Sequence, residues 1–328
     1  ISLLGGKEEK VLAVFPSLLG KGDEDAMKIV VSFVPQAATA GTPFIALHGV
    51  EPWEEEFFNH LTLPGLVVTT ARSRYGPEAL ATHVTGHVGT ADGKGKVGLE
   101  LVFNRELAGP SPTTLAAIID NKNNLVRGLG YRLWESKETH RPYNLILTID
   151  SNIQKKVEEI MDNRIARGGV VVMDPRSGDI LAMASRPNYL QVDLHRYLSG
   201  EEEYGDLLEA QPFINRAILS YPPGSVFKIV VAAAALETGK TWLGKRYYCP
   251  GFIKVGEKIF NCPHGPHDEV TLAQAFAHSC NSVFIELALE LGKETVYSYA
   301  AAMGLGKETG IPLGSAEQGG EAEGMLPL

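Results

Sequence analysis

Runs of β-branched and other apolar residues, separated by proline and glycine, fill the first part of the chain. Residues 11–15 and 29–34 are each closed by a proline, and residues 66–70 follow a Pro-Gly pair. Apolar runs bounded by such turn residues predict strands. Residues 113–119 predict a short helix or strand, and the glycine-rich residues 91–98 predict a flexible loop. This part of the chain is therefore predicted to be a mixed α/β region of short elements.

The pattern becomes one of longer elements after residue 142. Residues 145–149 (LILTI) predict a strand, and Ser151 with Gln154 has the spacing of a helix capping box. The apolar positions that follow lie on one helical stripe: Ile153, Val157, Ile160 and Met161. We therefore expect a domain boundary here, with one domain over residues 1–142 and a second over residues 143–328.

A hairpin and a second long helix follow. Residues 170–173 and 180–184 are apolar runs joined by a turn that contains proline and glycine, which predicts a β-hairpin. Residues 221–238 predict an apolar helix that ends at Gly239. Helices combined with an antiparallel hairpin indicate an α+β fold in which helices pack on a sheet.

Composition and charge exclude several classes of protein. The 328 residues are 44% hydrophobic and 21% charged, as in ordinary folded domains, and they suffice for two domains. The net charge of −9 argues against nucleic acid as a partner, since surfaces that bind nucleic acid are basic. The most apolar run, residues 229–236, is much shorter than the ~20 residues of a membrane span. We expect it to be a buried helix segment.

The two ends of the sequence suggest a fragment. The chain begins at Ile1, without methionine or a charged and apolar leader, and it stops after the Gly- and Glu-rich residues 317–324. We therefore expect any leader or membrane anchor to lie outside this sequence.

The strongest candidate for chemistry is Ser225, in the segment YPPGSVFK that opens the apolar helix. The prolines force an extended entry, so that Ser225 lies in the first helical turn and Lys228 on the same face. A serine hydroxyl becomes nucleophilic when a neighbouring base takes its proton. Lys228 can be that base if burial or nearby positive charge lowers its pKa. The alternative is a helix-capping serine followed by a surface lysine.

A second motif is Ser279-Cys280-Asn281, the one Ser-x-Asn in the sequence, as Ser225-x-x-Lys228 is the one Ser-x-x-Lys. In this order, and with the flanks PPGSVFKI and SCNSVFIELA, the two motifs resemble those of the penicillin-binding protein transpeptidases. Further stretches between residues 145 and 311 resemble the same family.

Earlier stretches resemble the non-catalytic pedestal of the class B members: residues 74–77, 83–86, 98–100 and 107–109. The resemblance implies an N-terminal mixed α/β pedestal domain over residues 1–142. Residues 143–328 would be a transpeptidase domain, with an antiparallel sheet flanked by helices.

The resemblance also implies a reaction and the residues that perform it. Ser225 would be the acylated nucleophile, and Lys228 the base that activates it. Ser279 would relay the proton to the leaving amine, and Asn281 would hold the carbonyl of the substrate peptide. A D-Ala-D-Ala stem peptide of peptidoglycan would acylate the serine, and an amine of a second strand would resolve the ester. β-Lactams would mimic D-Ala-D-Ala and stall at the acyl-enzyme, and no metal or cofactor is needed.

The family's third motif, Lys-Thr/Ser-Gly, is missing from this sequence, because residues 240–242 and 307–310 do not match it. We expect it in a C-terminal part of the domain that lies outside the sequence. The resemblance implies an extracytoplasmic location on the bacterial membrane, an N-terminal anchor, and protein partners in cell-wall synthesis. Two alternatives stay open: a β-lactam sensor or β-lactamase, and a catalytically inactive scaffold for cell-wall assembly.

The three cysteines are too few for a disulfide scaffold. Cys249, Cys262, His264 and His267 lack the closely paired cysteines of a standard zinc finger, so we expect no metal there. Their segment resembles a loop of sporulation-type class B members, which implies that Cys249 and Cys262 form either a disulfide or two free thiols. We expect Cys280 to face the core and to have no catalytic role.

Overall fold

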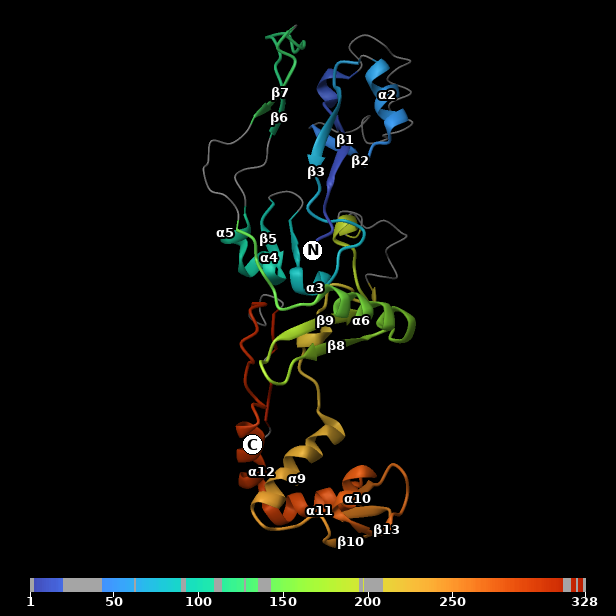
Figure 1. Cartoon of the computed structure of the whole chain (residues 1–328), viewed down its shortest axis with the longest axis vertical. Coiled ribbons are helices and arrows are strands. Elements are labelled where there is room, and N and C mark those ends of the chain that lie inside the picture. Colours follow the sequence, from blue (N-terminus) through green and yellow to red (C-terminus); the bar gives the residue numbers. More distant parts are fainter. Residues whose placement is uncertain are drawn as a thin grey trace. The chain divides into compact units, whose positions relative to one another are not determined.

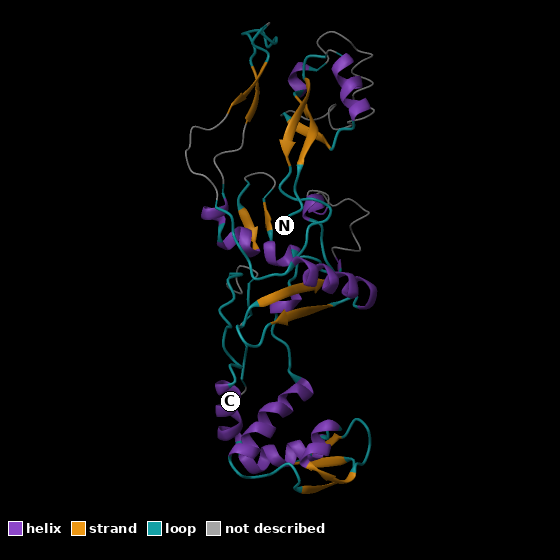
Figure 2. Cartoon of the chain, viewed as in Figure 1, coloured by secondary structure: helices purple, strands orange, loops and turns teal. Residues whose placement is uncertain are grey.

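The structure is a computed structural model of the chain. It describes residues 3–19, 43–61, 63–89, 93–108, 114–126, 128–134, 143–194, 197, 209–314, 320–322 and 324–326. These residues form two compact units, Ile1–Ala217 and Ile218–Leu328, whose helices and strands are labelled in Figure 1 and coloured by type in Figure 2. The helices and antiparallel strands confirm the predicted α+β class. The division differs from the predicted domain boundary after residue 142, which stays a prediction.

The first unit begins with an antiparallel sheet whose central strand, β1 (Glu8–Val14), lies between β2 (Phe44–His48) and β3 (Leu66–Arg72). Helix α2 (Pro52–His60) contributes Phe58 to the core of this sheet. The strands predicted over residues 11–15 and 66–70 are confirmed. The strand predicted over residues 29–34 lies outside the described residues.

Shorter helices and strands follow in the first unit, none longer than five residues. They are α3 (Thr82–Thr85), β4 (His87–Val88), β5 (Gly95–Val97), α4 (Gly98–Val102), α5 (Asn104–Leu107), β6 (Thr114–Ala117) and β7 (Tyr131–Trp134). The segment predicted as a short helix or strand is the strand β6. The prediction of a flexible loop is wrong for β5, which pairs with β4. Gly95 lets strand β5 lie close to the backbone of α4, because a Cβ atom at this position would overlap the carbonyl of Glu100.

An ion pair between the half-exposed Arg74 and the buried Glu100 joins the segment after β3 to helix α4. Arg74 donates from Nε and Nη2 to the carboxylate of Glu100 at 2.7 and 2.6 Å, and the hydroxyl of Tyr75 donates to the same carboxylate at 3.1 Å. The Val88 N–H in turn donates to the Tyr75 oxygen. Since Glu100 is buried, this bidentate pairing and the extra donor compensate for its desolvation.

Helix α6 (Ser151–Arg164) is present as predicted, but its cap and its buried face differ from the prediction. The carboxylate of Asp150 accepts from the N–H groups of Asn152 and Ile153, so Asp150 and not Ser151 is the N-cap. The buried positions of the helix are Gln154, Glu158 and Met161, whereas Ile153 and Ile160 are exposed.

Polar hydrogen bonds explain this buried face. The side-chain amide of Gln154 donates to the Met183 carbonyl at 2.9 Å and accepts from the Met183 N–H at 2.8 Å, as a neighbouring strand would. It also donates to Glu158, which accepts a second hydrogen bond from the Ala81 N–H. Apolar periodicity could not predict a face whose burial depends on hydrogen bonds.

Strands β8 (Gly168–Met173) and β9 (Ile180–Arg186) form the predicted antiparallel hairpin. The strand predicted over residues 145–149 is wrong: the segment is irregular, and Ile146 is 94% exposed. Only Asp150 and Thr148 bond to the β9 backbone beside it, at the Leu181 and Ile180 carbonyls. Short 3₁₀ turns follow at Gln191–Asp193 and Arg216–Ile218.

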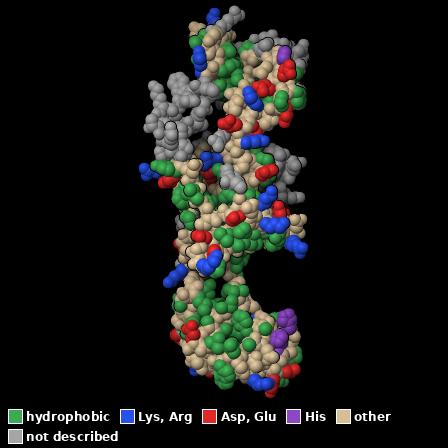
Figure 3. Space-filling view, in the orientation of Figure 1, with side chains coloured by type: hydrophobic (Ala, Val, Ile, Leu, Met, Phe, Trp, Pro, Cys, Tyr) green, Lys and Arg blue, Asp and Glu red, His purple; other side chains and the backbone are tan. Residues whose placement is uncertain are grey.

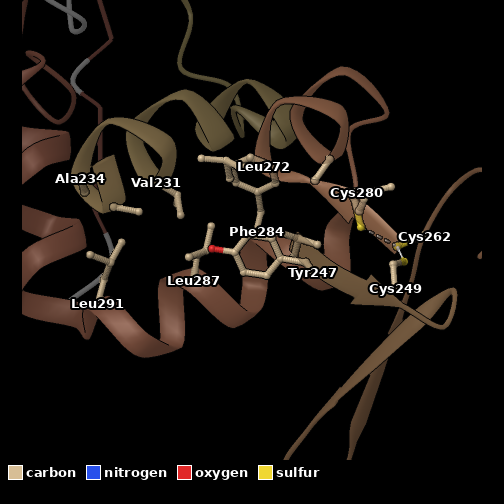
Figure 4. Packing of buried hydrophobic residues seen from close by; sticks show 14 residues of the cluster. Val231, Ala234, Tyr247, Cys249, Cys262, Leu272, Cys280, Phe284, Leu287 and Leu291 are labelled. Carbon is tan, nitrogen blue, oxygen red and sulfur yellow. Dashed lines mark hydrogen bonds between the residues drawn. The ribbon is translucent and has the colours of Figure 1, made fainter. Parts of the chain in front are cut away.

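Within the described residues, the second unit packs four helices against two small antiparallel sheets of two strands each. Its elements are the 3₁₀ turn η6 (Gly224–Phe227), α9 (Lys228–Glu237), β10 (Arg246–Cys249), β11 (Phe252–Val255), β12 (Lys258–Asn261), β13 (Asp268–Thr271), α10 (Leu272–Ala277), α11 (Asn281–Leu291) and α12 (Lys293–Ala302). Strand β10 pairs with β13 and β11 with β12, both antiparallel. Figure 4 shows the core between them, where Val231 of α9 and Leu287 of α11 lie near Tyr247 of β10.

Helix α9 is buried on one face only. Val231 and Ala234 are buried, whereas Ile229 and Leu236 are 51% and 38% exposed, so the expectation of a fully buried segment is wrong at its two ends. Among the described residues, the helices are all too short or too polar to cross a membrane.

We predict that Gln154→Leu destabilises the first unit by about 1–3 kcal/mol, because it leaves the buried N–H and C=O of Met183 without partners. Chemical denaturation of the purified protein measures this. Lys155→Leu is the matched control, since Lys155 is exposed on the same helix. An equal loss in both variants would contradict the role assigned to the Gln154 amide.

Candidate active site

Ser225 lies in the tight turn that starts the central helix of the second unit. Gly224 adopts a left-handed conformation with φ +55°, which turns the chain from the two prolines into η6. The 3₁₀ turn continues directly into α9, and Lys228 is the first residue of that helix. The Nζ atom of Lys228 lies 2.9 Å from the Ser225 Oγ. The local geometry predicted for this pair is thus present.

The second motif forms the short connection from α10 to α11. Ser279 has φ +52°, a left-handed conformation that is uncommon outside glycine. Both its Oγ and its carbonyl oxygen accept hydrogen bonds from Lys228 Nζ, at 2.9 and 3.0 Å. The strained turn therefore directs two oxygen atoms of one residue at the same amine.

Asn281 completes the group. Its Oδ1 accepts from Lys228 Nζ at 2.8 Å, while its Nδ2 donates to the backbone carbonyl of Asn261, at the end of β12, at 2.8 Å. These two bonds define which way the amide is turned. All four residues predicted as the site thus meet at one amine, although the two motifs lie far apart in the sequence.

Burial shifts the protonation of this amine. Desolvation lowers the pKa of Lys228 below its ordinary value, while the thiols of Cys280 and Cys262 act weakly in the opposite direction. A lower pKa increases the fraction of neutral amine near neutral pH. A neutral amine at 2.9 Å can accept the proton of the Ser225 hydroxyl, which an ammonium group cannot do.

Comparison with known proteins agrees with this geometry. Residues 168–324 match the family described as penicillin binding protein transpeptidase domain. The chain carries a penicillin-binding protein transpeptidase domain. The family recognised from the two motifs is thereby confirmed, while the roles of the individual site residues stay predictions.

Curated relatives of this chain include stage V sporulation protein D of Bacillus subtilis, 30% identical over 282 residues. That match covers 81% of this chain and 40% of the relative. The peptidoglycan D,D-transpeptidase MrdA of Acinetobacter baumannii is 29% identical, over 80% of this chain and 41% of the relative. The chain thus spans about two fifths of the length of these relatives.

A solved structure, the penicillin-binding protein PBP2 of Helicobacter pylori, is also similar. It superposes with a TM-score of 0.68 at 22% identity, over 98% of this chain and 66% of that chain. This likeness confirms the predicted fold, in which helices and antiparallel strands combine.

An apolar groove of about 740 Å³ adjoins Ser225 and Lys228 in the transpeptidase domain. Its walls come from α9, α11 and α12, and its apolar lining includes Phe227, Val231, Phe284, Ile285, Leu289 and Val296. Figure 3 shows hydrophobic side chains gathered on this face, over α9 and α11. The nucleophile candidate therefore lies at a surface depression and not in the core.

On the other side of the second motif, four potential metal ligands meet. Their ligand atoms all lie within 4.8 Å of one another, and we call them the cysteine–histidine cluster: Cys249, Cys262, His267 and Cys280. In the sequence, His264 and His267 are the histidines near the first two cysteines; in the structure, His267 and Cys280 join them and His264 does not. The three cysteines are free thiols in this structure. Cys280 is the middle residue of the Ser-x-Asn motif. A third cysteine at this position was the one feature of the sequence that could have indicated its place in the cluster.

The thiols of the cluster differ in acidity. Burial acts to raise the pKa of Cys249, but hydrogen bonds from Ser282, Gly251 and His267 outweigh it and lower this pKa to about 6. Burial raises the pKa of Cys280 to about 12. Cys280 is fully buried, as expected from the sequence.

We predict that Asn281→Asp raises the pKa of Lys228, because a carboxylate would replace the amide oxygen 2.8 Å from Nζ. NMR titration of isotopically methylated lysines measures this, with Lys228→Met assigning the signal. Asn163→Asp on α6 adds the same charge elsewhere and should leave the titration unchanged. An unshifted Lys228 signal in Asn281→Asp would show that the contact does not persist in solution.

Proposed function

We propose that the protein is a peptidoglycan D,D-transpeptidase that cross-links stem peptides through an acyl-enzyme on Ser225. One observation carries the proposal: the hydroxyls of Ser225 and Ser279 and the amide of Asn281 meet at the amine of Lys228. The relatives named peptidoglycan D,D-transpeptidase support the same reaction class.

Acylation begins with the pair at the helix start. The neutral amine of Lys228 accepts the Ser225 proton, and Oγ attacks the carbonyl of the penultimate D-Ala of a stem peptide. The Ser225 N–H, at the start of η6, is one donor to the oxyanion that forms. The partial positive charge at a helix start stabilises that negative charge further.

Departure of the terminal D-Ala needs a proton on its amine. Ser279 lies next to the protonated Lys228 and relays this proton through its hydroxyl. Asn281 uses one amide hydrogen for the Asn261 carbonyl, and its second hydrogen is available to the substrate's peptide carbonyl. An amine from a second strand then attacks the ester and releases Ser225.

The partners and the location follow from this reaction. The substrates are D-Ala-D-Ala stem peptides, β-lactams are the inhibitors, and proteins of cell-wall synthesis are the expected partners. Peptidoglycan lies outside the cytoplasm, so the protein would act on the extracytoplasmic face of the bacterial membrane, held by an N-terminal anchor.

The decisive experiment is intact-protein mass spectrometry of the full-length protein after incubation with benzylpenicillin. We expect one stable adduct per chain, lost in Ser225→Ala and kept in Ser220→Ala, which removes an exposed hydroxyl nearby. Rapid turnover of the adduct would indicate a β-lactamase instead. A folded protein that forms no adduct would favour the inactive scaffold.

The rate of acylation should increase with pH, because Lys228 acts only when deprotonated. Burial lowers its pKa, so the midpoint of the increase should lie below the ordinary lysine value of 10.5. Lys228→Met should slow acylation roughly 10²–10⁴-fold, as expected on removal of a general base. Stopped-flow measurements with a chromogenic β-lactam test both points.

The matched control is Lys240→Met, since Lys240 is exposed and precedes the Thr-Trp pair that does not match the third motif. It should keep both the rate and the pH midpoint. A pH profile that is flat in the wild type, or unchanged in Lys228→Met, would rule out Lys228 as the base.

A further inference from the structure

The cysteine–histidine cluster is assembled from four separate places in the chain. Cys249 ends β10, Cys262 directly follows β12, His267 directly precedes β13, and Cys280 is the N-cap residue of α11. Figure 4 shows the three cysteines converging at one edge of the core. No single local motif produces this convergence; the pairing of β10 with β13 and the packing of α11 against β10–β12 bring the ligand atoms together.

Three separations among the ligand atoms are close to those of a tetrahedron around a zinc ion, and all the ligand atoms lie within 4.8 Å of one another. Zinc binds thiolate at ~2.3 Å and imidazole at ~2.0–2.1 Å, so tetrahedral geometry separates two sulfurs by about 3.8 Å and sulfur from nitrogen by about 3.5 Å. The Sγ atom of Cys262 lies 3.5 Å from that of Cys249 and 3.7 Å from that of Cys280. The Cys249 Sγ lies 3.4 Å from the Nδ1 of His267.

Burial and chemistry also suit a structural zinc site. All three thiols are buried, and the four ligands close the coordination sphere without a position for water or substrate. Thiolates and imidazole are the soft ligands that zinc prefers over magnesium or calcium. Ser282 supplies outer contacts: its N–H and hydroxyl lie 3.5 and 3.3 Å from the Cys262 sulfur.

A disulfide between Cys249 and Cys262 would explain the positions of fewer of these side chains than a zinc ion does. A bond between Cys249 and Cys262 would leave the Cys280 thiol buried at 3.7 Å from it and His267 without a function in the cluster. The Nε2 atom of His267 is buried and has no hydrogen-bond partner within the described residues. The atom that would bind zinc is Nδ1, which lies 3.4 Å from the Cys249 Sγ, and the ring proton would then lie on Nε2.

We propose that the cysteine–histidine cluster binds one zinc ion in a closed site with three thiolates and one imidazole. The inference rests on the cluster alone and does not depend on the proposed function. It departs from the sequence-based expectation of no metal, which considered His264 together with Cys249, Cys262 and His267 and did not include Cys280.

The site would position the second motif. Cys280 stands between Ser279 and Asn281, and Cys262 directly follows Asn261, whose carbonyl receives the Asn281 amide. A zinc ion bound to both cysteines would therefore hold the α10–α11 turn and the end of β12 at a constant separation. Its ligands would be positioning residues, because they act through Ser279 and Asn281 and do not touch the Lys228 amine.

The test is metal analysis of the full-length protein, purified without chelator from zinc-supplemented cells. We expect about one zinc per chain by inductively coupled plasma mass spectrometry. Cobalt(II) added to the metal-free protein should give the intense visible bands of a tetrahedral site and a thiolate-to-cobalt charge-transfer band. His267→Gln should weaken zinc binding by more than the ~10–100-fold typical of outer-shell changes, whereas His264→Gln, three residues earlier, should retain full affinity.

Thiol counting under denaturing conditions keeps the test decisive even if His267→Gln fails to fold. Mapping of alkylated peptides should find Cys249, Cys262 and Cys280 all as thiols after denaturation with chelator, and all three should be protected from modification while zinc is bound. Alkylation of Cys280 alone, with Cys249 and Cys262 oxidised, would overturn the proposal in favour of a Cys249–Cys262 disulfide. Three thiols at these positions without metal, together with no cobalt spectrum, would overturn it in favour of a purely apolar role.

Discussion

Four oxygen atoms lie within hydrogen-bond distance of the Lys228 amine, and the fold of the second unit brings them together. One comes from Ser225 in the preceding helical turn, and three come from Ser279 and Asn281 in the α10–α11 turn. A partly buried amine gains from such partners, because unsatisfied polar groups are costly away from water. The same contacts bring two hydroxyl groups to the amine, as the proposed proton transfers require. The proposed chemistry and the burial of the amine therefore depend on the same few hydrogen bonds.

The first unit uses buried polar groups in the same way, but for structure alone. Gln154 takes the place of a neighbouring strand beside Met183, and Glu158 links helix α6 to the backbone at Ala81. Such groups stabilise a fold when every donor and acceptor is satisfied, and they destabilise it when one partner is removed. This explains why polar residues, and not an apolar stripe, form the buried face of this helix.

The cysteine–histidine cluster connects the core of the second unit to the site. Its side chains lie among the buried residues of β10 and α11, yet Cys280 is flanked by two residues that contact the Lys228 amine. A bond formed to Cys280 would therefore affect the position of the α10–α11 turn. This turn thus has one face toward the Lys228 amine and the other toward the three sulfur atoms.

Local features of the chain were predictable from its residues. The hairpin β8–β9 follows from apolar runs around a turn, and Ser225 and Lys228 share a helix face because they are three residues apart. The motifs also indicated that Ser279 belongs to the same site. Its left-handed turn, the buried face of α6 and the inclusion of Cys280 in the cluster were not predictable. Each depends on hydrogen bonds or packing between segments far apart in the sequence, and local periodicity carries no information about such partners.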